Sequence, residues 1–490
     1  MNQSLPLGDR LCRLAAEQGD RPAVITVDLE QRTETLNWHE LESLSAALAE
    51  RFSAVRPHDA DRRNAVVAVP AAHTLTSIVE LVAVLRAGLV AAPLDAQAPP
   101  ADRNARLEVI ARAAGQPVTP EELLRGKVAN TGSPATAHGG YLLLTGGTTG
   151  EPKPILRPGV PTWHPRVGPP LLLRETGWRT GQTHLVVGPL HHAAPFTHLL
   201  DGLLSGNTMV LPTMFYPELM VDLVEHYRIE WMQLTPTHMR LCDRILSSRA
   251  EALSSLRGVL HTAAPCPPDT KRVWVDAIGP ERVYEMYAAT EGMGVTLCRG
   301  SEWLARPGTV GRGFMTRIRI YDDEGHRLPP GETGVVHMCS PLGRRAPRVM
   351  RLGTGPASGV RPAGHDGFST AGDHGRLDAA GYLYLAGRQD DLVIIGGENV
   401  YTNDVTEVVL SHPDVADACV IPESDDLLGA VLTALVQPRT GTAPTSQDIA
   451  DHCRRHLARH KVPQQVRLVE RLPRSAAGKL LRPQLPGGAV

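Results

Sequence analysis

The sequence has no excess of charge of either sign and no long apolar segment. Its 50 lysines and arginines nearly balance 52 aspartates and glutamates, so the formal net charge is −2. A nucleic-acid-binding surface or a polybasic lipid-binding arm needs clustered positive charge, so neither is predicted. No apolar run approaches the roughly 18 residues that a membrane-spanning helix needs. We therefore expect neither a nucleic-acid partner nor a membrane partner.

Cysteine is scarce and scattered. The seven cysteines are odd in number and never form a C-x-x-C pair, which argues against a disulfide framework and against a zinc site. The first ten residues lack the positive region and apolar stretch of a secretory signal. These absences predict a cytoplasmic globular protein, and a length of 490 residues predicts two or three domains.

Helix and strand patterns alternate over the first third of the chain and again from about 184 to 290. Residues 39–53 have leucines at helical spacing, 66–69 form a short apolar run, and 76–87 show a second helical pattern. The order helix, strand, helix, strand predicts a parallel sheet covered by helices. Residues 305–385 change to short β-like runs separated by glycine-rich turns, which indicate a β-barrel-like subdomain.

A third pattern begins near residue 390 and predicts a compact α+β unit of about 100 residues, an ordinary domain size. The polar stretch at 388–391 marks the boundary. We predict a large N-terminal α/β domain over residues 1–388 and a small mobile C-terminal domain over residues 389–490. The expected strands of the small domain are 392–395, 415–421 and 431–436, and its expected helices are 403–411 and 447–460, the latter capped by Thr445 or Ser446.

A loop of glycines and threonines carries the most informative pattern. An apolar strand runs into six residues that are all glycine or threonine, and a lysine follows: Thr145, Gly146, Gly147, Thr148, Thr149, Gly150 and then Lys153. Glycines let backbone N–H groups converge on one anion, threonine hydroxyls add donors, and lysine supplies positive charge. The pattern favours phosphate binding over a plain surface turn. The spacing of a Walker-type loop is absent.

Six further motifs follow this loop in order along the chain: Gly188–His192, His261–Pro265, Tyr287–Gly292, Ser369–Asp373, Gly387–Asp391 with Gly396–Asn399 after it, and Pro473–Lys479. Together with the loop, they resemble the motifs of the adenylate-forming superfamily of acyl-CoA synthetases, adenylation domains and firefly luciferase. Any one of these matches could arise by chance, but seven in the family's order hardly could.

The resemblance implies a nucleotide site in the large domain. The loop around Thr148 and Lys153 would hold the β- and γ-phosphates of ATP. Thr290 would contact the α-phosphate, and Glu291 would bind Mg²⁺ through an oxygen, as a hard cation prefers. The full implied nucleotide-binding set is Thr145, Gly147, Thr148, Thr149, Gly150, Lys153, Ala264, Pro265, Tyr287, Asp373 and Arg388, with Asp373 on the ribose hydroxyls.

The resemblance also gives the small domain a catalytic part. Lys479 would bridge the substrate carboxylate and the α-phosphate in the first half-reaction, so the site is complete only when the domains close. The small domain would then rotate about a hinge at Asp390. This rotation would bring Gly396, Gly397 and Glu398 to line a tunnel for the thiol of coenzyme A.

The acyl pocket is implied by a histidine and several small residues: His192, Ala263, Ala264, Ala288 and Ala289. His192 fits a gating role and a purely structural pocket role equally well. No acid follows His192 until Asp201, which disfavours an α-amino acid substrate. Small residues are compatible with a roomy apolar pocket. We expect a large hydrophobic acid, bulky or polycyclic.

The implied functional residues also have ordinary structural interpretations. Glu291 could start a helix, Asp373 could stabilise a turn, and Lys479 could be a solvated charge. No such interpretation predicts the ordered set of motifs.

Three residues depart from the family's usual pattern. Gly146 replaces a serine, Pro154 replaces the glycine that follows the lysine, and Ala288 replaces the glycine that follows the tyrosine. These changes leave an alternative function open, in which the enzyme only forms the thioester from a preformed acyl-adenylate.

The main prediction is an acyl-CoA ligase that uses ATP, Mg²⁺ and coenzyme A on a small carboxylic acid. A stand-alone adenylation enzyme that loads a carrier protein stays open. So do a non-catalytic relative that only binds nucleotide or acyl ligand and, given a special substrate, luciferase-like oxygenation.

Overall fold

The computed structural model divides the chain into two compact units. The first contains residues 1–262, 274–292 and 341–356, and the second contains residues 263–273, 293–340 and 357–490. The structure describes residues 4–54, 65–125, 139–145, 152–288, 292–340, 350–351, 361–362, 367–388, 392–395, 398–425, 428–474, 480 and 485.

A five-stranded sheet in the first unit has the order β18-β7-β6-β5-β4. Strand β5 pairs in parallel with β4 and β6, whereas β7 runs antiparallel to β6 and β18. Helix α3, whose first turn is capped by Thr74, connects β4 to β5 as the sequence pattern predicted. The strands are β4 (Val66–Pro70), β5 (Val90–Leu94), β6 (Gly140–Thr145), β7 (Lys153–Pro158) and β18 (Met350–Arg351).

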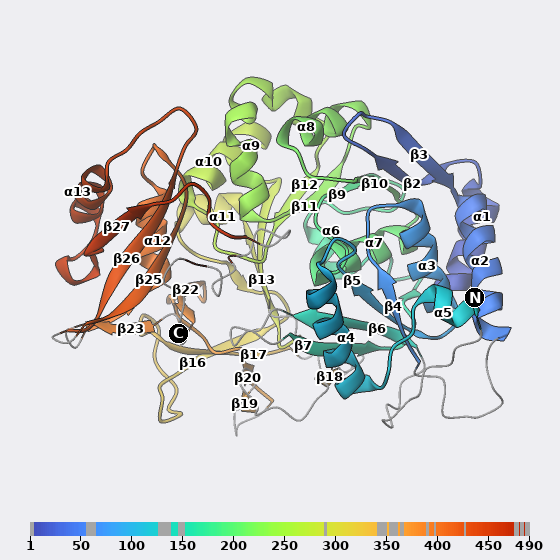
Figure 1. Cartoon of the computed structure of the whole chain (residues 1–490), viewed down its shortest axis with the longest axis horizontal. Helices are drawn as coiled ribbons and strands as arrows, with labels where there is room; N and C mark the ends of the chain where they lie inside the picture. The colour runs from blue at the N-terminus through green and yellow to red at the C-terminus, as the bar shows by residue number, and fades with distance from the viewer. Residues whose placement is uncertain are drawn as a thin grey trace. The chain divides into compact units, whose positions relative to one another are not determined.

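The first unit also contains seven neighbouring strands in the order β13-β12-β11-β9-β10-β2-β3 (Figure 1). Every pair in this series is parallel except β2 with β3. The parallel sheet predicted from the alternating pattern is therefore confirmed. The strands are β2 (Pro22–Val27), β3 (Thr33–Asn37), β9 (Thr183–Val186), β10 (Thr208–Pro212), β11 (Trp231–Leu234), β12 (Gly258–His261) and β13 (Val283–Ala288).

Helices connect the strands up to residue 288, with one short strand pair, β1 (Leu5–Pro6) and β8 (Thr162–Trp163), beside them. The helices are α1 (Leu7–Gln18), α2 (Trp38–Ala54), α3 (Leu75–Arg86), α4 (Pro100–Ala114), α5 (Pro120–Leu124), α6 (Leu171–Glu175), α7 (Ala193–Leu204), α8 (Pro217–His226), α9 (Pro236–Arg249) and α10 (Pro268–Ile278).

Both faces of the five-stranded sheet are buried. On β4, Val67 and Val69 belong to a core shared with α1, α2, α3 and α7, whereas Val66 and Ala68 pack with residues of α4. Successive strand residues point to opposite faces, so a strand buried on both faces reads as a continuous apolar run. Strands β2, β9 and β10 also contribute to the first core. One core therefore joins the two sheets of this unit.

Helix α2 buries a slightly different face from the one that its leucine spacing predicted. Leu41 is buried, but Leu44 is 50% exposed. Ser45 is buried instead, and its Oγ donates a hydrogen bond to the carbonyl oxygen of Leu41 at 2.6 Å and accepts one from Nη1 of Arg86 at 3.1 Å. Because these partners satisfy the hydroxyl, the buried polar group costs little stability.

The β-rich segment of the second unit is a six-stranded antiparallel sheet. Its order is β19-β20-β17-β21-β22, with β16 beside β17. A further antiparallel pair, β14 (Val295–Arg299) with β15 (Arg312–Gly313), flanks helix α11 (Gly300–Ala305). The six strands are β16 (Arg317–Tyr321), β17 (Gly334–Cys339), β19 (Arg361–Pro362), β20 (Ser369–Thr370), β21 (Asp373–Leu377) and β22 (Leu383–Arg388).

The C-terminal part of the second unit has the predicted α+β composition. Strand β26 pairs antiparallel with β25 and parallel with β27, and β23 and β24 form a hairpin. The apolar faces of α12 and α13 pack on these strands in one core. The elements are β23 (Leu392–Ile395), β24 (Glu398–Tyr401), α12 (Thr402–Leu410), β25 (Val415–Asp425), β26 (Gly429–Pro438), α13 (Ser446–His456) and β27 (Gln465–Leu468).

Helix α13 begins where predicted and ends four residues early. Thr445 caps it, because its Oγ1 accepts a hydrogen bond from the N–H of Asp448 at 3.2 Å and the Asp448 carboxylate accepts one from the N–H of Thr445 at 2.8 Å. The backbone turns extended at Leu457, with φ −121° and ψ 149°, and this residue packs against the C-terminal core. Tertiary packing therefore ends the helix at His456 rather than at residue 460.

Among the helices that the structure describes, none has the length and apolar character that crossing a bilayer requires.

The core of the first unit depends on Phe196 of α7, which is fully buried and contacts the Tyr141 ring edge-on, with 5.1 Å between ring centroids. We predict that Phe196→Ala lowers the free energy of unfolding by about 3–5 kcal/mol, because it leaves a cavity. Leu241→Ala on α9, where the side chain is 55% exposed, should change it by less than about 0.5 kcal/mol. Urea unfolding followed by tryptophan fluorescence measures both, and equal losses would contradict the assignment of this core.

Candidate functional site

The predicted phosphate loop closes a β-hairpin. Strands β6 and β7 pair up to Thr145 opposite Lys153, so the connecting loop starts and ends at one end of the hairpin. Lys153 is the first residue of β7 and is partly buried. The side chain of Thr145 and all of Gly146, Gly147, Thr148, Thr149 and Gly150 lie outside the described residues.

Pro154, one of the departures from the family's pattern, is the second residue of the hairpin strand β7. It lies opposite Leu144 on β6. On its other side, β18 pairs with β7 only at Ile155 and Leu156. A proline next to the start of a strand is tolerated where no partner needs its N–H. The described part of the hairpin therefore accommodates this substitution.

Three predicted segments begin at the same edge of the parallel sheet. Strands β9, β12 and β13 are parallel members of one series, so the segments that follow them leave from their carboxyl ends. In open α/β sheets, this edge is where ligands bind. The hydroxyl of Thr262, directly after β12, donates to the carbonyl oxygen of Met286 on β13 at 2.8 Å. That bond ties two of the segments together.

The motif that begins at the end of β13, Tyr287–Gly292, is described only in part. Tyr287 is partly buried and Ala288 is exposed at the strand end. Ala289, Thr290 and Glu291 lie outside the described residues. Their predicted roles at the α-phosphate, at Mg²⁺ and in the acyl pocket stay predictions.

The segment after β12 contains a strained residue. Ala263 has φ +83°, in the left-handed region that alanine rarely adopts. Such strain costs about 1–3 kcal/mol and is found most often at functional sites. Ala263, Ala264 and Pro265 are all exposed, so their small side chains are free to line a ligand site.

A histidine pair lies at the start of α7, in the segment after β9. His192 is the N-cap residue of this helix and is partly buried. Its ring lies 4.3 Å from the ring of His191, centroid to centroid. Burial lowers the pKa of His191. The helix cap therefore fixes the backbone of His192 at the carboxyl edge of the sheet.

His73 holds this segment in place, although no sequence pattern pointed to it. Its Nδ1 lies 2.6 Å from the carbonyl oxygen of Pro212, and its Nε2 lies 3.0 Å from that of Gly188. Gly188 starts the segment that leads to His192, and Pro212 ends β10. His73 therefore ties the histidine-bearing segment to a sheet strand. It lies in a loop between β4 and α3 with no recognisable motif, so only the tertiary structure reveals it.

Asp373, predicted to bind the ribose, and Arg388, predicted to lie in the nucleotide site, are cross-strand neighbours in the second unit. Asp373 begins β21 and lies opposite Arg388 on β22. Asp373 is buried, whereas the side chain of Arg388 lies outside the described residues. Before Asp373, Gly372 has φ +84° and its N–H donates to Thr370 Oγ1 at 3.0 Å. This tight turn positions the aspartate at the start of its strand.

The predicted hinge and thiol tunnel are described only at their edges. Ile395 pairs with Glu398, so Gly396 and Gly397 form the connection of the β23–β24 hairpin, a position that favours Gly-Gly. These two glycines, Asp390 and the side chain of Glu398 lie outside the described residues.

The segment that carries Lys479 is anchored at both ends. Arg474 and Leu480 form an isolated antiparallel bridge around it. The guanidinium of Arg474 makes two hydrogen bonds to the carboxylate of Asp417, at 2.5 and 2.6 Å, a strong bidentate geometry. Leu480 packs against a small apolar cluster. Lys479 itself lies outside the described residues.

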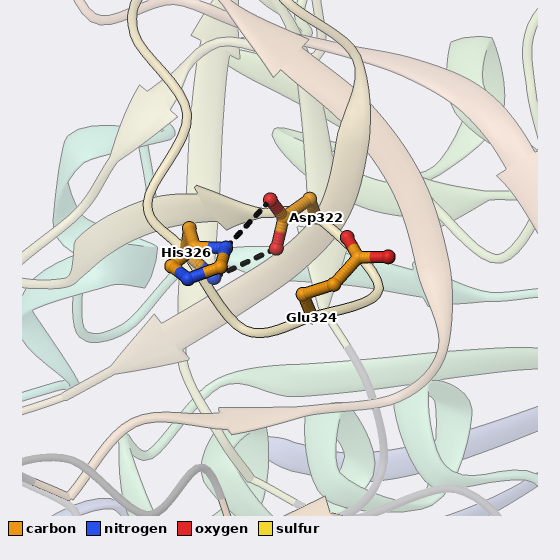
Figure 2. A group of neighbouring side chains, drawn as sticks. All are labelled: Asp322, Glu324 and His326. Carbon is orange, nitrogen blue, oxygen red and sulfur yellow. Dashed lines mark hydrogen bonds and ion pairs between the residues drawn. The ribbon is translucent and has the colours of Figure 1, made fainter.

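One group among the described residues has a donor set that could hold a metal ion: Asp322, Glu324 and His326 in the β16–β17 connection (Figure 2). Asp322 accepts hydrogen bonds from the N–H of His326 at 2.7 Å and from its Nδ1 at 3.2 Å. Glu324 and His326 are exposed. These bonds are those of an aspartate that stabilises a turn, so they account for the group without a metal.

Asp201 on α7 is the acid closest in sequence after the histidine pair. Burial raises the pKa of its carboxyl to about 7, and the positive charge of Arg157 opposes this rise. Burial also raises the pKa of Tyr141 to about 12. Nε of Arg157 is buried and has no hydrogen-bond partner in the described part of the chain. An acid of this kind is mostly uncharged below neutral pH.

Comparisons with known proteins agree with this geometry. The family described as AMP-binding enzyme matches residues 111–344, and the family described as AMP-binding enzyme C-terminal domain matches residues 404–479. A feruloyl-CoA synthase from Amycolatopsis sp is 31% identical over 345 residues, covering 70% of this chain and 68% of that protein. A 2-succinylbenzoate–CoA ligase from Bacillus cereus is 31% identical over 352 residues, covering 70% of this chain and 69% of that protein.

Solved structures share the fold over nearly the whole chain. The o-succinylbenzoate CoA synthetase MenE from Bacillus subtilis, in complex with the acyl-adenylate intermediate OSB-AMP, has a TM-score of 0.77, 24% identity and 98% coverage of both chains. The same protein with ATP and magnesium ion has a TM-score of 0.74 and 25% identity, and covers 99% of this chain and 100% of its own. The predicted fold class, a large α/β N-terminal domain with a small C-terminal domain, is confirmed.

Because the pKa of Asp201 is raised, the difference in stability between Asp201→Asn and the wild-type protein should grow as pH rises. The folded state retains the proton up to about pH 7, whereas the unfolded state releases it near pH 4, so the wild-type protein loses stability as pH rises from 4 through 7. Asp201→Asn lacks this ionisation. It should therefore be more stable than wild type by up to about 4 kcal/mol at pH 8.5, and close to wild type at pH 4.

Thermal unfolding of both proteins from pH 4 to pH 8.5 measures this difference. Asp323→Asn, at an exposed position of the β16–β17 connection, serves as the control and should show no such trend. A difference between Asp201→Asn and wild type that stays constant with pH would contradict the proposed burial of the charge.

Proposed function

The chain belongs to the AMP-binding enzyme family, and we propose that it joins a hydrophobic carboxylic acid to coenzyme A through an acyl-adenylate. The enzyme class, an AMP-forming acid–thiol ligase that uses ATP, Mg²⁺ and coenzyme A, is the one that the motifs predicted. One observation carries the proposal: the family matches cover both the AMP-binding region and a C-terminal region that extends to Lys479.

The first half-reaction brings an anion to a polyanion. A carboxylate oxygen of the acid forms a bond to the α-phosphorus of ATP, and the bond to the β-phosphate oxygen breaks to release pyrophosphate. Charge neutralisation and positioning therefore supply most of the catalysis. We assign the β- and γ-phosphates to the loop on the β6–β7 hairpin, with Lys153 at its base. Thr290 would contact the α-phosphate, and Glu291 would supply the Mg²⁺ ligand.

In the second half-reaction the thiol sulfur of coenzyme A bonds to the acyl carbon, and AMP leaves. We assign Lys479 to the first step and the Gly396–Glu398 hairpin to the thiol tunnel of the second. For Lys479 to leave the active site and the Gly396–Glu398 hairpin to enter it, the small domain must rotate about a hinge. We propose Asp390 as this hinge and residues 389–490 as the small domain. The Arg474–Asp417 pair supports the assignment of Lys479, because it holds the lysine segment on the body of this domain.

The substrate proposal rests on the acyl pocket. Exposed alanines at the strand ends, Ala263, Ala264 and Ala288, leave room for a bulky acid. The names of the two relatives, feruloyl and 2-succinylbenzoate, both denote acids with an aromatic ring. We therefore propose a ring-bearing hydrophobic acid, with a polycyclic acid as one member of this class. All seven cysteines are free thiols, which supports a cytoplasmic location.

A second candidate function is thioester formation from an acyl-adenylate supplied by another enzyme. Two substitutions in motifs assigned to the nucleotide favour it. Gly146 lacks the hydroxyl donor of the family's serine, and Ala288 adds a methyl group where the family has glycine. Pro154 favours it less, because the described hairpin accommodates a proline there. Loading of a carrier protein is a variant of the main proposal with a different thiol.

A panel of carboxylic acids tests the main proposal and both variants. Each acid is incubated with ATP, Mg²⁺ and either coenzyme A or a phosphopantetheinylated carrier protein, and mass spectrometry detects acyl-AMP and the thioester. We expect acyl-AMP and acyl-CoA from ring-bearing hydrophobic acids. Thioester only from added acyl-AMP would establish the second candidate. Product on the carrier alone would establish carrier loading, and no product under any condition would overturn all three.

Lys479→Ala should separate the two half-reactions. We predict that it slows acyl-adenylate formation on the order of 100-fold, because a cation between two anions is lost. Thioester formation from added acyl-AMP should slow by less than about tenfold. Rapid-quench measurements of each half-reaction test this.

Lys461→Ala is the matched control, since Lys461 lies in the same small domain and pairs with Asp404 at 3.2 Å. It should leave both half-reactions close to the wild-type rate. Equal slowing of both steps in Lys479→Ala would contradict the role assigned to this lysine.

A further inference from the structure

An open, solvent-facing cavity of ≈ 640 Å³, whose three arginines are exposed, lies at the amino ends of the parallel strands in the first unit. Thr183, in its lining, is the first residue of β9. The lining also contains the residue immediately before each of β11, β12 and β13, namely Glu230, Arg257 and Arg282. The segments assigned to the nucleotide and the acid leave from the carboxyl ends of the same strands. The cavity therefore lies at the opposite edge of the sheet from the candidate active site.

The cavity carries an excess of positive charge. Its lining contains Arg228, Arg257 and Arg282 but only one acid, Glu230. Nε of Arg257 pairs with Oε1 of Glu230 at 2.9 Å, which balances one charge. The other two charges have no acid partner in the lining. Glu251 lines only an adjoining cavity of ≈ 350 Å³.

The donors of two arginines remain largely unused. Nη1 of Arg282 donates to the carbonyl oxygen of Leu256 at 3.3 Å, and its other N–H groups have no partner in the described part of the chain. The guanidinium of Arg228 has no hydrogen bond or ion pair among the described residues. The nearby acids Asp222 and Glu225 on α8 instead pair with Arg249, so they do not neutralise the cavity.

The backbone at Arg228 has a left-handed conformation that residues other than glycine rarely adopt. Its φ is +49°, two residues after α8 ends at His226. The N–H of Ile229 bonds to the carbonyl oxygen of Val224 at 3.0 Å, and that of Arg228 bonds to Glu225 at 3.4 Å. This is a helix ending in which glycine is usual, because a side chain costs stability there.

An arginine near a helix C-terminus is favourable in any backbone conformation, through the helix dipole. That interaction alone gives no reason to place the arginine at the one position that favours glycine. The strain is explained if the guanidinium is needed in the cavity.

We propose that this cavity is a second binding site, for a phosphate-bearing anion. Arginine forks match phosphate oxygens with paired hydrogen bonds, and the hydroxyls of Ser254 and Ser255 add polar groups to the lining. A cavity of this size accommodates a polyphosphate or a nucleotide. The site is independent of the proposed ligase chemistry, because none of its residues belongs to the motifs assigned to catalysis.

Isothermal titration calorimetry with inorganic tripolyphosphate at constant ionic strength tests the site. Since the predicted phosphate loop can bind the same probe, the titration is made on Lys153→Ala. We expect this variant to retain one tripolyphosphate site, and Arg228→Gly in the same background to weaken it on the order of tenfold. Arg282→Gln should weaken it similarly. Arg51→Gln, an exposed arginine outside the lining, is the charge-matched control and should leave the affinity unchanged.

Thermal unfolding without ligand separates a binding role from a structural one. Arg228→Gly should be as stable as the parent or more stable, because it relieves the left-handed strain. Unchanged tripolyphosphate affinity in both arginine variants, or an equal loss in Arg51→Gln, would overturn the proposal. A parallel titration with ATP distinguishes the source: equal affinity identifies a polyphosphate site, and tighter ATP binding identifies a nucleotide site.

Discussion

The parallel pairing of β9, β11, β12 and β13 is the constraint on which the candidate site depends. Parallel strands are stable only with both faces covered, so each strand must be followed by a crossover segment. Those segments all leave from one edge, and this is why the histidine pair and the strained Ala263 follow strand ends at the edge where Tyr287 lies near the end of β13. The same geometry places the residues that precede the strands, including Arg257 and Arg282, at the opposite edge.

The segments assigned to charge chemistry are held at their bases by ordinary structural interactions. The phosphate loop closes where Thr145 pairs with Lys153, on a hairpin whose apolar side chains are buried. The lysine segment near the C-terminus is held by the Arg474–Asp417 pair. A rigid base with a glycine-rich or short loop lets backbone donors approach an anion without disturbing the core. Positioning of this kind suits the proposed reaction between two anions.

Histidine in this protein serves structure as well as the candidate site. His198 is packed against Trp231, with 5.0 Å between ring centroids, and burial lowers its pKa to about 3. His73, by contrast, uses both ring nitrogens to join the backbone carbonyl groups of Pro212 and Gly188, and Gly188 starts the segment that leads to His192. Both residues are histidines, so residue type alone does not distinguish the uncharged, packed ring of His198 from the carbonyl-bridging ring of His73. Their surroundings decide which role each takes.

The sequence by itself determined the family, the fold class and the order of elements, because apolar periodicity and glycine-rich motifs are local properties of the chain. It also narrowed the cap of α13 to Thr445 or Ser446 and predicted a turn at Gly396-Gly397. Only the tertiary structure decided that Ser45 rather than Leu44 is buried, that His73 holds Gly188, and that three arginines distant in sequence share one cavity. These features depend on contacts between residues far apart in the chain, which no local pattern encodes.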